Sequence, residues 1–148
     1  MKIEDEINDY ISSQPQAKSV ELKELHTLIQ QMNTAGKLWF LDGKNSENKV
    51  VSNPNIGYGT SRIKYTDGKT RDFYQIGLSA NSSGISIYIM GINDKTYLSQ
   101  TYSGIIGKAT VTGYCIKFKT LKKINIDILQ AAIRFGFEQG KHPGPVVK

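Results

Sequence analysis

Apolar residues recur at helical spacing in three parts of the chain. The first set predicts an amphipathic helix over residues 3–13, which ends before Pro15 because a residue that precedes proline avoids the helical conformation. The second set predicts a helix over residues 16–33, and the third a helix that Asn125 caps and that runs to about Gln139. The apolar stripes are Ile3, Ile7, Tyr10 and Ile11; Leu22, Leu25, Leu28, Ile29 and Met32; and Ile128, Leu129, Ala132, Ile133 and Phe135.

Between the second and third helices the apolar period changes to two, which is typical of strands. "RIKY" and "DFYQIGL" flank Asp67-Gly68, a dipeptide that favours a two-residue hairpin turn. "GISIYIM" predicts a strand with its three isoleucines on one face. "GYCIKFK" predicts another, with Tyr114, Ile116 and Phe118 pointing inward and Cys115, Lys117 and Lys119 outward. Two further short strands are predicted at "KLWFL" and "KVV", and a short helix or irregular turn over residues 94–103.

This order of elements, helices first, then strands, then a closing helix, predicts an α+β fold. We expect an antiparallel sheet of about five strands, with two N-terminal helices and one C-terminal helix packed on one face. The other face is then partly open to solvent. One domain over residues 1–140 and a flexible tail over 141–148 account for the chain of 148 residues.

The composition is that of a globular protein, with 39% hydrophobic and 22% charged residues. The single cysteine fits a reducing compartment, the acidic N-terminus lacks the apolar region of a signal peptide, and no apolar run approaches the ~20 residues of a membrane span. We therefore expect a cytoplasmic protein without a membrane partner. The net charge of +6 is uneven, since residues 1–25 carry six acids against three lysines and the remainder 16 basic against 7 acidic residues. That asymmetry is compatible with an anionic partner or with a solvated basic surface.

Strand alternation places tyrosines and basic residues together on the outward face of the predicted sheet. This face is a candidate site for an anionic small molecule or for single-stranded nucleic acid, through charge and stacking. The alternative is that solvent-facing strand positions favour these residue types without any ligand. Trp39 either lines a cavity with one of these tyrosines or fills the core. The candidate ligand-binding residues are Trp39, Tyr58, Arg62, Lys64, Tyr88, Lys117 and Lys119.

The sequence offers little for catalysis. "GIIGKA" and Gly57-Tyr58-Gly59 lack the spacing and the following helix of a phosphate loop. Cys115 has no histidine near it in a catalytic pattern, because His26 lies on a helix and His142 in the tail. We expect a protein that is not an enzyme.

The first predicted helix carries a group of carboxylates that could bind a hard cation such as iron. Acidic residues in a first turn also complement the helix dipole without binding any metal, and the spacing does not separate the two explanations. The candidate metal ligands are Glu4, Asp5, Glu6 and Asp9.

Three segments together resemble the YdhG-like family of small bacterial domains: "IGYGTSRIKYTDGKTRDFYQIGLS", "ISIYIM" and "TGYCIKFKTLKKINIDIL". The resemblance extends from about Ile7 to Ile133. It implies a compact α+β fold and a cytosolic bacterial setting, and some members are described as frataxin-like iron chaperones. Iron handling by a non-catalytic, chaperone-like domain is therefore the first functional hypothesis, binding of an anionic ligand the second, and a homodimer formed through the open sheet face the third.

Overall fold

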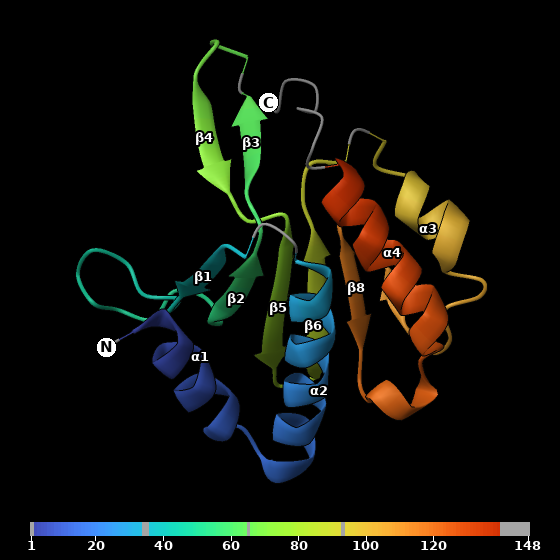
Figure 1. Cartoon of the computed structure of the whole chain (residues 1–148), viewed down its shortest axis with the longest axis horizontal. Helices are drawn as coiled ribbons and strands as arrows, with labels where there is room; N and C mark the ends of the chain where they lie inside the picture. Colours follow the sequence, from blue (N-terminus) through green and yellow to red (C-terminus); the bar gives the residue numbers. More distant parts are fainter. Residues whose placement is uncertain (1, 34–35, 65, 93, 140–148) are drawn as a thin grey trace.

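A six-stranded antiparallel sheet forms the centre of the computed structural model (Figure 1), which describes residues 2–33, 36–64, 66–92 and 94–139. Its strands lie in the order β1-β2-β5-β6-β8-β7. Their bounds are Leu38–Leu41 for β1, Asn55–Tyr58 for β2, Ile76–Asn81 for β5, Gly84–Ile89 for β6, Thr110–Val111 for β7 and Cys115–Phe118 for β8. The predicted α+β fold is confirmed, with six strands in the sheet where about five were expected.

Two N-terminal helices and one C-terminal helix pack on one face of this sheet, as predicted. They are α1 (Ile3–Ser12), α2 (Gln16–Met32) and α4 (Ile126–Gln139). Figure 1 shows α2 and α4 lying across the face that is turned to the viewer. The cap predicted for α4 is present, since the Ile128 N–H donates to Asn125 Oδ1 at 3.3 Å. A short helix α3 (Tyr97–Tyr102) and a 3-10 turn η1 (Leu121–Lys123) complete the chain's helical elements in the described residues.

The face under the helices, called the inner face here, is built from alternate residues of the long strands. In β6 all three isoleucines, Ile85, Ile87 and Ile89, are buried on it, as the alternation predicts. Leu78 of β5 lies opposite Ile87 and is also fully buried. Each such side chain removed from water contributes about 1.5–3 kcal/mol to stability. The helical stripes supply the other half of this core.

The remaining strand positions point to the opposite, outer face, and the strand register aligns five of them in one row. Trp39 lies opposite Gly57, Gly57 opposite Gly77, Gly77 opposite Tyr88, and Tyr88 opposite Cys115. The row therefore crosses β1, β2, β5, β6 and β8. With about 4.8 Å between neighbouring strands, it is roughly 19 Å long.

The predicted hairpin around Asp67-Gly68 is also present, but it is not part of the main sheet. Strands β3 (Ser61–Lys64) and β4 (Thr70–Phe73) pair only with each other and project from the body at the top of Figure 1. Gly68 has the positive φ of +87° that favours glycine. Strand β3 ends at Lys64 and β4 begins at Thr70, so they are separated in the sequence by more than the two residues expected.

Two other expectations about strands need correction. "KVV" does not form a strand, because only an isolated bridge joins Val50 to Lys44. "DFYQIGL" is divided between β4 and β5, since the chain leaves the hairpin at Tyr74 and enters the main sheet at Ile76. The predicted tail over 141–148 lies outside the described residues. Among the described residues, no helix is long and apolar enough to cross a membrane.

Candidate functional site

Tyr58 does not belong to an outward ligand-binding face, and that prediction is wrong. It lies on the inner face with Ile56 and has 0% exposure. Its hydroxyl is 2.7 Å from Nδ1 of the half-buried His26 on α2. Burial raises the pKa of Tyr58 well above its ordinary value and lowers the pKa of His26. The pair is a polar contact within the core, where both groups remain neutral near pH 7.

The predicted grouping of Arg62 and Lys64 with the sheet tyrosines is also wrong for Arg62. Gly59 has φ +74°, and the chain there leaves β2 for the separate hairpin. Arg62 is exposed on that hairpin and its Nε lies 3.5 Å from Asp72 Oδ1. The backbone of Lys64 belongs to β3, whereas its side chain is outside the described residues. Strand parity therefore does not carry across the glycine.

Trp39 packs as part of the sheet and lines neither of the two pockets described below. Its indole N–H donates to the Gly59 carbonyl at 2.8 Å. The Lys37 ammonium lies 5.1 Å from the centre of its ring, and Phe73 meets it edge-on at 6.1 Å between ring centres. The indole remains half-buried, so part of it faces solvent.

The structure does bring Tyr88 and Lys117 to the same face. Tyr88 lies opposite Cys115 in the outer row, and Lys117 follows two residues later on β8. Tyr114 was predicted to point inward, but it precedes β8 and is 56% exposed. Its ring is stacked at 6.2 Å from that of Tyr88. Cys115 is on the predicted face but buried there, and burial raises the pKa of its thiol.

A pocket with four lysines lies beside this face, at the end of the sheet where β7 and β8 meet η1. We call it the lysine pocket, and its volume is about 390 Å³. All four lysine side chains are exposed, and no carboxylate is among the residues that line it. The lining residues are Ser83, Lys108, Ala109, Thr110, Lys117, Phe118, Lys119, Thr120 and Lys123.

Backbone contacts hold these lysines near one another although they come from separate segments. The Lys108 N–H donates to the Lys123 carbonyl at 3.0 Å, which fixes the segment before β7 against η1. Thr110 pairs with Lys117 across the two strands. Gly84 at the start of β6 has φ +149°, and a Cβ there would lie 2.1 Å from the Phe118 carbonyl oxygen. Glycine at this position therefore lets β8 and its lysines approach the β5–β6 turn.

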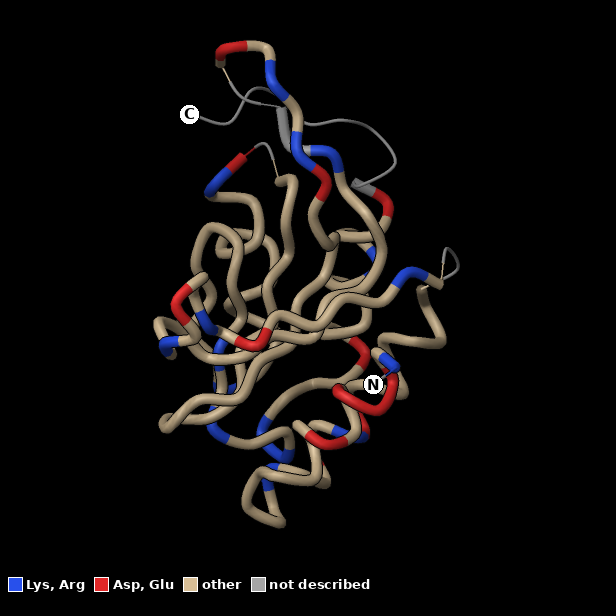
Figure 2. Tube along the Cα trace, turned by 90° about the vertical axis from the view of Figure 1, so that its left-hand side faces the viewer, with Lys and Arg blue, Asp and Glu red and all other residues tan. Residues whose placement is uncertain are grey.

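The charges of the lysine pocket are not neutralised within the described part of the chain, where none of its four lysines forms an ion pair. Glu21 of α2 brings one carboxylate to the rim, where it accepts a hydrogen bond from the Thr120 hydroxyl at 2.8 Å, and its single negative charge faces four positive ones. Figure 2 shows several blue segments at the lower end of the molecule and red segments near the N-terminus, with further segments of both colours on the hairpin at the top.

Strand alternation predicted two of these four lysines, Lys117 and Lys119, and missed the other two. Lys108 follows Gly107 in "GIIGKA", a segment that lacks the spacing and the following helix of a phosphate loop. Lys123 lies in "LKK" after the strand. The nearness of the two depends on the contact between residue 108 and residue 123, which no local pattern predicts.

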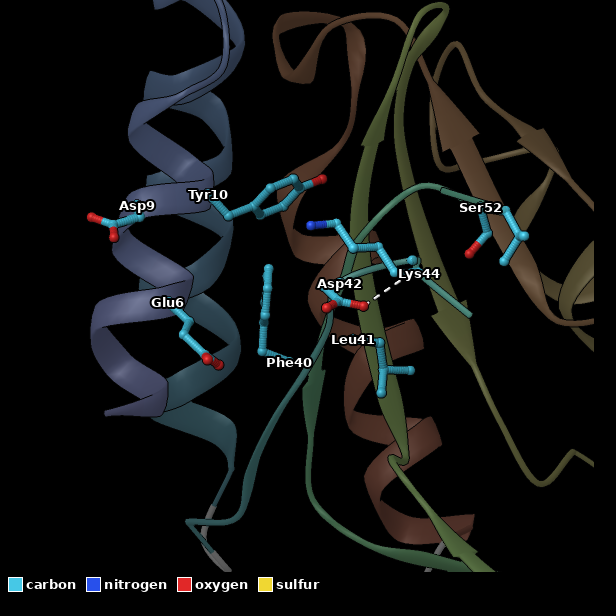
Figure 3. A pocket seen from close by; sticks show the side chains of 10 residues that line it. Glu6, Asp9, Tyr10, Phe40, Leu41, Asp42, Lys44 and Ser52 are labelled. Atoms are coloured by element: carbon cyan, nitrogen blue, oxygen red, sulfur yellow. Dashed lines mark hydrogen bonds between the residues drawn. The ribbon is translucent and has the colours of Figure 1, made fainter. Parts of the chain in front are cut away.

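The acidic residues of α1 border a different and mixed hollow, shown in Figure 3. Its volume is about 710 Å³, and it lies between α1 and the segment after β1. Glu6 and Asp9 line it together with Asp42 and Lys44, whereas Glu4 and Asp5 do not. In Figure 3 the Asp9 carboxylate points to the side of α1 away from Asp42. In the parts of the chain that the structure describes, no group of three or more His, Cys, Asp or Glu side chains is placed to hold a metal ion. Iron binding by this helix stays a prediction.

Comparisons with known proteins leave the family resemblance untested, because no family model, no curated protein and no solved structure matches this chain.

Proposed function

We propose that this protein is a non-catalytic binding module for a ligand that carries phosphate groups or several other negative charges, and that the lysine pocket is its binding site. The observation that carries the proposal is the convergence of Lys108, Lys117, Lys119 and Lys123 on one hollow whose lining contains no carboxylate.

Lysine side chains suit such a ligand because the ammonium is a compact point charge on a flexible stem. Two like charges about 4 Å apart near a protein surface repel by roughly 4 kcal/mol. The exposed ammonium groups here reduce that repulsion by spreading into solvent. An anion placed between them turns the same arrangement into attraction, which supports a polyanionic ligand over a neutral one.

The pocket favours binding over chemistry, since its lining includes no His, Cys, Asp or Glu side chain to act as a base or nucleophile. Elsewhere in the described residues, the imidazole of His26 is engaged by the Tyr58 hydroxyl at 2.7 Å. Cys115 is buried, and burial raises the pKa of its thiol.

Titration calorimetry with inorganic tripolyphosphate at low ionic strength tests the proposal. The variant K108Q/K117Q/K119Q/K123Q should lose at least tenfold in affinity for tripolyphosphate. The affinity of the unaltered protein should fall steeply as salt is added. A matched control is K2Q/K23Q/K44Q/K69Q, which removes the same charge from exposed lysines elsewhere. Equal losses in the two variants would reduce the effect to net charge. Absence of binding to the unaltered protein at low salt would overturn the proposal.

A further inference from the structure

We infer that the polyanion is single-stranded nucleic acid, whose backbone occupies the lysine pocket while its bases stack on aromatic side chains of the outer face. The inference rests on the proposed function, because it requires the lysine pocket to bind phosphate. The aromatic residues concerned, called the aromatic row here, are Trp39, Phe73, Tyr74, Tyr88 and Tyr114.

Glycines at the centre of the sheet make the aromatic row continuous. Gly57 and Gly77 lie side by side on β2 and β5, and the ring of Tyr74 covers both. A Cβ on Gly57 would be 2.5 Å from Tyr74 Cδ2, and one on Gly77 would be 2.6 Å from Tyr74 Cε1. The ring therefore lies flat on the backbone and fills the outer face between Trp39 and Tyr88.

On the hairpin side, Phe73 extends this surface away from the strands. Its ring stacks on Tyr74 at 4.1 Å with an interplanar angle of 27° and contacts Trp39 edge-on. Tyr74 itself is only 4% exposed, so Phe73 and Trp39 present the accessible ring atoms here. Lys37 lies over Trp39 and Arg71 over Phe73, with the cation 5.1 and 5.0 Å from the respective ring centres. Both cations are placed to meet phosphates of a strand that runs across these rings.

At the other end of the row, packing does not account for the exposure of Tyr114. The Ile89 N–H donates to its carbonyl at 2.8 Å, which fixes the backbone beside β6. The side chain nevertheless remains 56% exposed, stacked beside Tyr88. Two nearly parallel tyrosine rings at an exposed sheet surface form a platform for a base, because every base has a π-face.

Lys117 connects this platform to the lysine pocket. It lies on the outer face two residues along β8 from Cys115, so the Cα atoms of Lys117 and Cys115 are about 7 Å apart. Cys115 in turn lies opposite Tyr88. Lys117 also lines the lysine pocket. A nucleotide whose base rests on Tyr88 and Tyr114 therefore has its phosphate within reach of the Lys117 ammonium group, and the strand can continue from there into the lysine pocket. Charge complementarity and stacking thus point to the same occupant.

The aromatic row supplies rings, and Lys37 and Arg71 beside it supply cations, whereas an arrangement of hydrogen-bonding groups that would read base edges is not apparent among these residues. Binding should therefore tolerate many sequences and depend strongly on salt. Four phosphate contacts with a single strand contribute about −3 to the slope of the logarithm of affinity against the logarithm of salt concentration. The variant with all four pocket lysines replaced by glutamine should make the slope less negative by about this amount, and the contacts of Lys37 and Arg71 should remain.

The test compares an oligothymidylate of about eight nucleotides with an abasic oligomer of equal length and charge, and with tripolyphosphate. Binding is followed by fluorescence anisotropy of a labelled strand and by the emission of Trp39, the single tryptophan. We expect the oligothymidylate to bind at least tenfold more tightly than the abasic strand, a difference of about 1.4 kcal/mol. We also expect it to quench Trp39, because the indole belongs to the aromatic row.

Variants separate the aromatic contribution from that of charge. Y88L and Y114A should each reduce oligothymidylate affinity about tenfold and leave tripolyphosphate binding unchanged. Y88F keeps the ring and should keep the affinity, and Y97L serves as a control that removes a half-buried ring from α3. Equal binding of the abasic strand and oligothymidylate would overturn this inference and leave the proposed function standing. Binding of neither strand nor tripolyphosphate would overturn both.

Discussion

The two faces of the central sheet use the same strands for different purposes. The inner face carries aliphatic side chains, such as Leu78 and Ile87, which are fully buried against α2 and α4. The outer face carries Gly57, Gly77 and Tyr88 at the alternate positions, and the Tyr74 ring covers the two glycines. Aliphatic side chains thus fill the inner face, whereas on the outer face two glycines leave room for the Tyr74 ring to lie on the backbone.

Because of this difference, we expect the inner face of the sheet to contribute to stability and the outer face to contribute to binding. A side chain on the inner face contributes by the apolar area that it buries. On the outer face, the more exposed tyrosine and lysine side chains bury little apolar area. The repulsion among the lysines is not compensated by ion pairs in the described residues. We therefore expect substitutions on the inner face to change folding, and those at exposed outer positions to change binding.

The largest expected effect is on the inner face. L78A removes a fully buried side chain that pairs across the sheet with Ile56 and Ile87. It should lower the free energy of unfolding by about 2–5 kcal/mol because a cavity remains. Urea denaturation measures the change, and Y114A, at an exposed outer position, is the control, with an expected change of no more than about 0.5 kcal/mol. Equal losses from the two variants would contradict the division between the faces.

A smaller effect is expected where the outer face is itself closely packed. G77A places a methyl group against the Tyr74 ring, 2.6 Å from Cε1, so the ring must move off the sheet. We expect a loss of about 1–3 kcal/mol in unfolding free energy and a change in Trp39 emission, because Phe73 joins Tyr74 to the indole. G104A is the control, since nothing lies within 4 Å of its added Cβ. A stable G77A protein with unchanged emission would show that Tyr74 does not require the glycine.

The third effect concerns Tyr58, the polar side chain that interrupts the aliphatic inner face. Y58F removes the hydroxyl that contacts His26 at 2.7 Å and should cost about 1 kcal/mol. H26Q should cost a similar amount, and the double variant should cost less than the sum, because both changes remove one contact. Additive losses in urea denaturation would indicate that the contact contributes nothing.

The same contact predicts a dependence on pH. Because burial lowers the pKa of His26 below its ordinary value of about 6.5, the unfolded chain takes up a proton first as the pH falls. The contribution of His26 to stability is therefore complete above pH ~6.5 and declines as the pH falls through and below that value. Tyr58 stays neutral throughout, since burial raises its pKa. H26Q should show a smaller loss of stability than the unaltered protein between pH 7 and pH 5.5; an identical loss would assign the effect to other groups.

Local patterns in the sequence predict most of the fold. The stripes of the three long helices, the inward isoleucines of β6 and the Asn125 cap each depend on residues within one element. The hairpin at Asp67-Gly68 is equally local, because Gly68 needs only a turn conformation. These are the features for which periodicity and turn chemistry are sufficient.

The candidate site could not be predicted in the same way, because it depends on register and on contacts between distant segments. Alternation counted outward from β3 gave Tyr58 the wrong face, since the chain turns at Gly59 between two separate sheets. Tyr74 covers two glycines only because β2 and β5 pair in one particular register. Lys108 reaches the other pocket lysines through a backbone contact with residue 123.

The smallest expected effect on stability belongs to the lysine pocket. Replacing Lys108, Lys117, Lys119 and Lys123 by glutamine removes like charges that have no ion-pair partner in the described residues. The unfolding free energy should stay within about 0.5 kcal/mol of its original value at physiological salt, and it should rise at low salt, where the repulsion is screened least. Urea denaturation at two salt concentrations measures this, with K2Q/K23Q/K44Q/K69Q as the control of equal charge. A marked loss of stability specific to the pocket variant would mean that these lysines support the fold, and any loss of binding would then no longer identify a ligand site.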